Sequence, residues 1–204
     1  MVRLAGIYQP SSNATHSPPT EMAFTSKALT AFIQHIKARP DPHILDMGPV
    51  CSENINFLAQ KVHQLFICDM FIRLDQKHQK GQAPGGVWQH IDYAPDTFDG
   101  ILMWGLPGRL DADVVGQLGK KCHRLLKAGG LVMVCALGEN KKNTRVDAFV
   151  LAGDSSISFR GQPHLDLPLY TRNTRELVDS LAPLKLVQSF LFRNGLREFL
   201  FRKE

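Results

Sequence analysis

The chain lacks any long apolar run, and this absence excludes a membrane-spanning helix from the expected structure. Such a helix needs ~20 consecutive apolar residues, and no stretch of the sequence approaches that length. The N-terminal residues are rich in Ser, Pro, Asn and Thr and lack the apolar core of a secretory signal peptide. We therefore expect a cytoplasmic protein that has no membrane partner.

Cysteine is scarce, and its spacing excludes a zinc finger and a disulfide framework. The chain has 4 cysteines, and none of them stands in the CxxC spacing that structural zinc sites use. Cys68 and Cys135 lie within apolar runs, where a buried free thiol is the ordinary state. We expect no metal site.

The sequence also lacks a P-loop, a Ser-His-Asp order and a paired-carboxylate signature, so none of these catalytic classes is indicated. Positive charge is in modest excess, with a formal net charge of +5. A basic protein can bind a polyanion, but the lysines and arginines are scattered along the chain. A solvated surface is the preferred interpretation, and a nucleic-acid partner stays an alternative.

What the chain does contain is an alternation of helix and strand signals. Residues 1–20 have no hydrophobic periodicity and are expected to form a mobile arm, followed by one domain over residues 21–204. Within it, residues 137–168 are expected to be a polar, glycine-punctuated insert. Apolar runs predict strands at about residues 43–47, 65–68, 87–91, 100–104, 131–136, 184–192 and 197–202. Helices are predicted at about residues 24–36, 52–62, 70–79, 112–126 and 174–181.

This order predicts the fold class. Strands that alternate with helices form a mostly parallel sheet with helices on both faces. Asn194-Gly195, between the last two strands, is a strong signal for an antiparallel hairpin. The expected fold is therefore α/β and doubly wound, with a seven-stranded, mostly parallel sheet that ends in a C-terminal antiparallel hairpin.

Residues 43–69 form the most informative segment. They have the pattern of a strand, a glycine turn, a helix and a second strand that ends at Asp69. A unit of this kind points its turn and the N-terminus of its helix at a ligand. An acid at the end of the second strand can accept both hydroxyls of a ribose, which is the role we expect for Asp69.

The turn itself is irregular, since it has Gly48-Pro49-Val50-Cys51-Ser52 where nucleotide-binding loops repeat glycine. Pro49 removes a backbone donor, and the β-branched Val50 disfavours a positive φ. Ser52 is a plausible N-cap, and the amides that follow it can face a carboxylate. Ligand binding is therefore expected, but in a loop whose backbone donors and conformation differ from those of a glycine-rich loop.

Four segments, ILDMG (44–48), ICDM (67–70), residues 87–104 and CHRLLKAGGLVMV (122–134), together resemble the motifs of the class I S-adenosylmethionine-dependent methyltransferases. Their order and spacing match that family over almost the whole chain. The resemblance implies a seven-stranded sheet whose last strand is antiparallel, with S-adenosylmethionine bound at the carboxyl ends of the first three strands.

The resemblance also implies roles for individual residues. The acid Asp46 would reach the amino group of the cofactor, Asp69 would hold the ribose, and Asp92 would accept from the adenine amino group. Tyr93 and Met70 would lie against the adenine, and Trp104 would form a wall beside the methyl group or the substrate. The cofactor-binding set is then Asp46, Gly48, Pro49, Val50, Ser52, Asp69, Met70, Asp92, Tyr93 and Trp104.

The acceptor side is less defined. Arg109 stands where many small-molecule members of the family carry a histidine, and an arginine cannot act as a general base because it stays protonated. It could instead bind an anionic substrate. No catalytic residue is assigned, since an in-line displacement from a sulfonium depends mainly on proximity and alignment.

The leading hypothesis is methyl transfer to a small or medium-sized acceptor. A non-catalytic binding or regulatory protein of the same fold is an alternative, which Val50 and the missing glycines suggest. A third alternative, suggested by the positive charge, is an RNA-directed methyltransferase. The acceptor and the oligomeric state are not indicated by the sequence.

Overall fold

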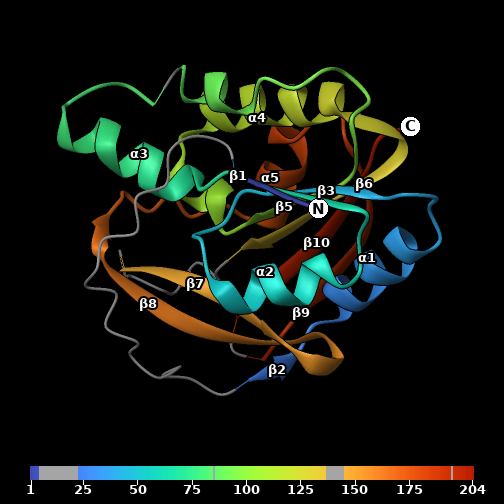
Figure 1. The fold of residues 1–204 in the computed structure, drawn as a ribbon. Coiled ribbons are helices and arrows are strands. Elements are labelled where there is room, and N and C mark those ends of the chain that lie inside the picture. The colour runs from blue at the N-terminus through green and yellow to red at the C-terminus, as the bar shows by residue number, and fades with distance from the viewer. Residues whose placement is uncertain (5–22, 85, 137–144, 194) are drawn as a thin grey trace.

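The structure is a computed structural model that describes residues 1–4, 23–84, 86–136, 145–193 and 195–204. A seven-stranded sheet is covered by helices on both faces, and a second, three-stranded sheet packs beside it (Figure 1). The helices are α1 (Lys27–Lys37), α2 (Ser52–Ala59), α3 (Met70–Gln79), α4 (Ala112–Leu125) and α5 (Thr174–Ser180), with 3-10 turns η1 (Val87–Ile91), η2 (Leu106–Arg109) and η3 (Gly153–Ser155). The strands are β1 (Val2–Leu4), β2 (Phe24–Thr25), β3 (His43–Asp46), β4 (Gln64–Ile67), β5 (Phe98–Trp104), β6 (Leu126–Ala136), β7 (Arg145–Ala152), β8 (Ser156–Asp166), β9 (Lys185–Leu191) and β10 (Arg197–Arg202).

The large sheet has the order β1-β4-β3-β5-β6-β10-β9. Strands β1, β4, β3, β5 and β6 run parallel, whereas β10 runs antiparallel to both β6 and β9. This arrangement confirms the predicted α/β class, with seven strands and a C-terminal antiparallel hairpin. No helix in the described part of the chain is long and apolar enough to cross a membrane.

Two cores lie on opposite faces of the sheet because successive strand residues point to opposite sides. Ile101 belongs to the core that contains the buried side chains of α3, α4 and α5. Its neighbour Leu102 belongs to the core beneath α1, α2 and the small sheet. In the orientation of Figure 1, α3 and α4 lie above the large sheet, and α1 and α2 lie below it.

Helix α1 lies unusually close to the sheet at Gly100. A Cβ added to Gly100 would come within 2.5 Å of the Phe32 ring and 2.8 Å of the Ile36 side chain. Ser26 caps the helix by accepting a hydrogen bond from the Leu29 amide, and the buried Glu198 carboxylate accepts another from the Ala28 amide at 3.1 Å. These contacts fix α1 against β5 and β10.

The predicted strand over residues 87–91 is wrong, since Val87–Ile91 is the 3-10 turn η1. The edge of β4 that this segment would pair with is taken by Val2–Leu4, which lie parallel to β4. The apolar run therefore buries Val87, Trp88 and Ile91 through a turn instead of a strand. Because β1 belongs to the sheet, the mobile-arm prediction is also wrong for residues 2–4; residues 5–22 lie outside the described part.

The predicted insert contains regular structure. Strands β7 and β8 form a long antiparallel hairpin, and β2 joins the outer side of β8. The apolar residues of this hairpin, among them Phe149, Leu151 and Ile157, are buried in the core beneath α1 and α2. Residues 137–144 of the predicted insert lie outside the described part.

The small sheet is fastened to the first turn of α2. The buried Asn54 side chain donates to the Phe149 carbonyl at 2.8 Å and accepts from the Leu151 amide at 2.8 Å. Glu53 and Arg160 form an ion pair in which two guanidinium nitrogens contact the carboxylate. This pair lowers the pKa of Glu53 to about 2, mainly through the hydrogen bonds from Arg160.

Replacement of Asn54 by alanine should lower the free energy of unfolding by about 2–4 kcal/mol, because two buried backbone groups of β7 would lose their partners. Urea denaturation measures this change. Asn56→Ala is the matched control, since Asn56 lies on the exposed side of the same helix. Equal losses in the two variants would contradict the role given to Asn54.

Candidate functional site

The candidate site lies where the carboxyl ends of β3, β4 and β5 meet. The chain passes from β3 to β4 on one side and, later, from β5 to β6 on the other. Such a reversal of strand order is where open α/β sheets form their ligand crevice. The polar residues Asp46 and Asp69 and the N-terminus of α2 all lie at this edge.

Asp46 is the last residue of β3 and is almost completely buried, at 5 % exposure. Its Oδ1 accepts hydrogen bonds from the Gly48 amide at 3.0 Å and from the Trp104 indole nitrogen at 2.7 Å. Burial raises the pKa of this carboxyl to about 6, and the two hydrogen bonds oppose part of that rise. Asp46 therefore ties the glycine turn to the end of β5.

Trp104 closes the space above the turn. The pairing of β5 with β6 shifts register between Leu102 and Trp104, and Trp104 has a φ of 52°, so an irregular strand end aims its side chain. The indole packs directly on Gly48, where an added Cβ would come within 2.5 Å of the ring. The indole also stacks on Phe149, with ring centroids 5.5 Å apart.

Asp69 is the N-cap of α3, and both of its oxygens are engaged by the backbone. Oδ1 accepts from the Ile72 amide at 3.0 Å, and Oδ2 accepts from the Val50 amide at 3.0 Å. Burial raises the pKa of this carboxyl, and the amide hydrogen bonds lower it. The turn that follows β3 is thus bonded directly to the acid at the end of β4.

The other residues of the turn take part in local packing. Cys51, not Ser52, is the N-cap of α2, because its Sγ accepts from the Asn54 amide at 3.4 Å; the predicted Ser52 cap is wrong. The exposed Ser52 hydroxyl instead donates to Glu53. Pro49 is buried and Val50 is half-buried against the core beneath α1 and α2.

The structure does not bring all of the predicted cofactor residues together. The Asp92 carboxylate is 79 % exposed and forms ion pairs with Lys121 and Arg124 of α4. Tyr93 packs edge-on against Phe66 and Phe98. The fully buried Met70 lies in the core under α3. The roles assigned to these residues stay predictions.

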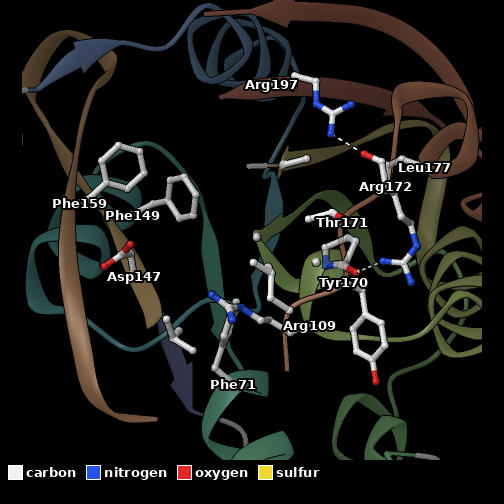
Figure 2. A pocket seen from close by; sticks show the side chains of 16 residues that line it. Phe71, Arg109, Asp147, Phe149, Phe159, Tyr170, Thr171, Arg172, Leu177 and Arg197 are labelled. Carbon is white, nitrogen blue, oxygen red and sulfur yellow. Dashed lines mark hydrogen bonds between the residues drawn. The ribbon is translucent and has the colours of Figure 1, made fainter. Parts of the chain in front are cut away.

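A cavity of about 50 Å³ is lined in part by Phe149 (Figure 2), whose ring stacks on the Trp104 indole. One water molecule occupies roughly 10–15 Å³ on the same measure, so this space can hold a small organic group. Arg109, the predicted substrate residue, lines the cavity and is only 6 % exposed. Burial lowers the pKa of Arg109, against the attraction of Asp147.

Two residues that the sequence analysis missed shape this site. Phe149 braces Trp104, and Asn54 holds the backbone of Phe149 in place. The segment from Val146 to Leu151 contains an apolar patch that could have indicated a buried strand. No local signal shows that this strand packs on the end of β5.

Comparison with known proteins supports the fold. No protein-family model matches the chain, and no curated protein sequence matches it. A methyltransferase structure from Methanosarcina mazei, described as S-adenosylmethionine-dependent, is similar with a TM-score of 0.54 at 15% identity, covering 84% of this chain and 96% of that one. The 1,6-didemethyltoxoflavin-N1-methyltransferase of Burkholderia thailandensis, crystallised with S-adenosylhomocysteine, is similar with a TM-score of 0.51 at 16% identity. The match covers 87% of this chain and 78% of that one. The [4+2]-cyclase SpnF is similar with a TM-score of 0.51 at 13% identity, covering 86% of this chain and 83% of that one.

S-adenosylmethionine would have to occupy the space above Gly48, and the observed side chains do not leave that space open. The Trp104 indole lies on Gly48 and donates a hydrogen bond to the Asp46 carboxylate. The Val50 amide donates a hydrogen bond to the Asp69 carboxylate. The polar groups suit the cofactor in kind, whereas the Trp104 indole covers Gly48 in this structure.

Replacement of Asp46 by asparagine should remove a pH dependence of stability. The folded-state pKa of about 6 lies above the ordinary pKa of 3.8 for an aspartate, so the stability contributed by neutral Asp46 is present below pH ~4 and is lost as the pH rises through 6. The free-energy advantage of Asp46→Asn over the wild type should therefore grow by roughly 3 kcal/mol between pH 4 and 7. Urea denaturation at several pH values measures it, and a difference that stays constant with pH would contradict the assignment.

Proposed function

We propose that this chain, which has the fold of the class I S-adenosylmethionine-dependent methyltransferases, transfers a methyl group from that cofactor to a small or medium-sized acceptor. One observation carries the proposal: Asp46, Asp69 and the first turn of α2 lie together at one edge of the sheet, at the reversal of strand order. This is where a nucleoside ligand binds in folds of this type.

The chain's own residues would contribute binding and positioning. Asp69 suits a ribose, because each carboxylate oxygen can accept more than one hydrogen bond. The N-terminus of α2 suits a carboxylate. When bound, the cofactor supplies a methyl group on a sulfonium, and the role of the protein is to align an acceptor with it.

A second candidate is a binding protein of this fold that has no methyl-transfer activity. The packing of Trp104 on Gly48 favours it, since a fully buried indole already occupies the space above the turn. Fold alone does not choose between the candidates, and a neighbour of the same fold is described as a cyclase.

Binding of S-adenosylhomocysteine separates the two candidates. Under the first proposal the wild type binds it, Trp104→Ala binds at least ~10-fold more tightly because the turn is uncovered, and Asp69→Asn binds at least ~10-fold more weakly; a tenfold change corresponds to about 1.4 kcal/mol. Asn is chosen at position 69 because it still caps α3. Isothermal titration calorimetry measures all three proteins.

Asp113→Asn, an exposed aspartate in the first turn of α4, serves as the matched control and should bind as the wild type does. If neither the wild type nor Trp104→Ala binds S-adenosylhomocysteine, the methyl-transfer proposal is refuted. The closed crevice is then the permanent state of the protein, as the second candidate requires.

A further inference from the structure

The last part of strand β8 connects the two helices whose N-termini lie at the candidate site. Arg160 is ion-paired with Glu53 in the first turn of α2, with 2.6 Å between a guanidinium nitrogen and a carboxylate oxygen. Further along the strand, the Asp166 amide donates to the Asp75 carboxylate of α3 at 2.9 Å. In Figure 1, β8 passes beneath α2 and continues towards α3. The strand is therefore fastened to both helices.

Between these two contacts, β8 departs from regular pairing with β7. The register shifts between Arg145 and Asp147, so residues 162–165 bulge out of the ladder. Bulges of this kind re-aim side chains and are common beside functional sites. His164 lies in this bulge. Burial raises the pKa of Asp69, and backbone amides and the charge of His164 oppose that rise, so the bulge lies on the Asp69 side of the candidate site.

Arg160 stands at the other end of the same segment, beside the turn that follows β3. Two of its nitrogens donate to the two oxygens of Glu53. These hydrogen bonds raise the pKa of Arg160, against the effect of burial, and Cys51 is also close enough to act on its charge. The side chains of Arg160 and Glu53 are 19 % and 37 % exposed, so solvent reaches the pair.

Glu53 does not satisfy the whole guanidinium. The Nε of Arg160 is buried and has no hydrogen-bond partner among the residues that the structure describes. Buried donors are nearly always paired, and a guanidinium carries five N–H donors in a planar fork. The Nε side of this fork therefore lacks an acceptor.

The surroundings of Arg160 favour an anionic acceptor. Because Glu53 belongs to the first turn of α2, its partner Arg160 lies at the N-terminus of that helix. Backbone N–H groups and the helix dipole attract negative charge there. Pro49 removes one of the amides with which a glycine-rich loop would bind such a group. A guanidinium supplied by β8 compensates for that missing donor.

We propose that Arg160 recognises the carboxylate of a ligand bound at the candidate site, through the Nε side of its guanidinium, while Glu53 orients the arginine and repels the same carboxylate. Hydrogen bonds between a guanidinium and a carboxylate are among the strongest that proteins form. The inference rests on the proposed function, in which this carboxylate belongs to the amino-acid end of S-adenosylmethionine. Arg160 is then a specificity-determining residue that the small sheet supplies.

S-adenosylhomocysteine is the probe, and 5′-methylthioadenosine, which has the nucleoside and the sulfur but no amino-acid end, is its control. Arg160→Gln should bind S-adenosylhomocysteine at least ~10-fold more weakly than the wild type, because a charge-assisted hydrogen bond is lost. Glu53→Gln should bind it at least ~3-fold more tightly, because a repelling charge is removed. Both variants should bind 5′-methylthioadenosine as the wild type does. Isothermal titration calorimetry measures these affinities.

The two substitutions have opposite expected signs, which a purely structural ion pair would not produce. If the pair only fastens β8 to α2, both variants lose the same contact, and both weaken the binding of the two compounds alike. Arg175→Gln is the matched control, since the Arg175 side chain is 92 % exposed on α5, and it should bind both compounds as the wild type does.

A folded Arg160→Gln that keeps its affinity for S-adenosylhomocysteine would overturn the proposal, and so would weaker or unchanged binding by Glu53→Gln. If Arg160→Gln does not fold, as judged by circular dichroism, Arg160→Lys replaces it. Lysine keeps the charge but not the planar fork, so a smaller loss confined to S-adenosylhomocysteine supports the proposal, and unchanged affinity overturns it.

The outcome is separable from that of the proposed function. If S-adenosylhomocysteine binds and the substitutions leave its affinity unchanged, only the role of Arg160 is refuted. If only Trp104→Ala binds the probe, the substitutions are made in that variant. If neither the wild type nor Trp104→Ala binds it, the methyl-transfer proposal and this inference are both refuted.

Discussion

The hydrogen bond between the Trp104 indole and the Asp46 carboxylate joins the ends of the two central strands, and the rest of the site depends on it. Both partners are buried, and the bond is 2.7 Å long. It keeps the indole over Gly48, where no residue with a Cβ could stand. A carboxyl that would otherwise be costly in the interior thereby acquires two donors, one from the indole and one from the Gly48 amide.

The small sheet connects this contact to helix α2. Phe149 lies against the indole, and the backbone of its strand is bonded to Asn54 of α2. The ion pair of Glu53 with Arg160 adds a second connection between the same two elements. The turn after β3, helix α2, the hairpin and the end of β5 thus support one another, and none of them can be rearranged alone.

Much of this architecture is visible in the sequence, because it depends on local patterns. The segment from His43 to Asp69 shows its strand, helix and strand through hydrophobic periodicity, and α3 begins and ends where the pattern predicts. The same pattern gave a wrong prediction for residues 87–91, because a short apolar run can be buried either in a strand or in a 3-10 turn. The deciding fact is distant: Val2–Leu4 already occupy the edge of β4.

The candidate site shows the same division between local and distant information. Asp46, Gly48 and Asp69 could be found because each stands at a fixed place in a β-α-β unit. The sequence does not reveal that the Val50 amide bonds Asp69 or that Trp104 covers Gly48. Those contacts depend on a register shift at the end of β5 and on a hairpin about 45 residues further along, and neither has a signature near the turn.

Phe149 gives the site one property that neither of its neighbours has alone. One face of its ring supports the indole above the glycine turn, and the ring also forms part of the cavity that contains Arg109. The glycine turn and the cavity therefore share one wall. A substitution that changes the size of the Phe149 ring would therefore alter the support of the indole and the lining of the cavity at the same time.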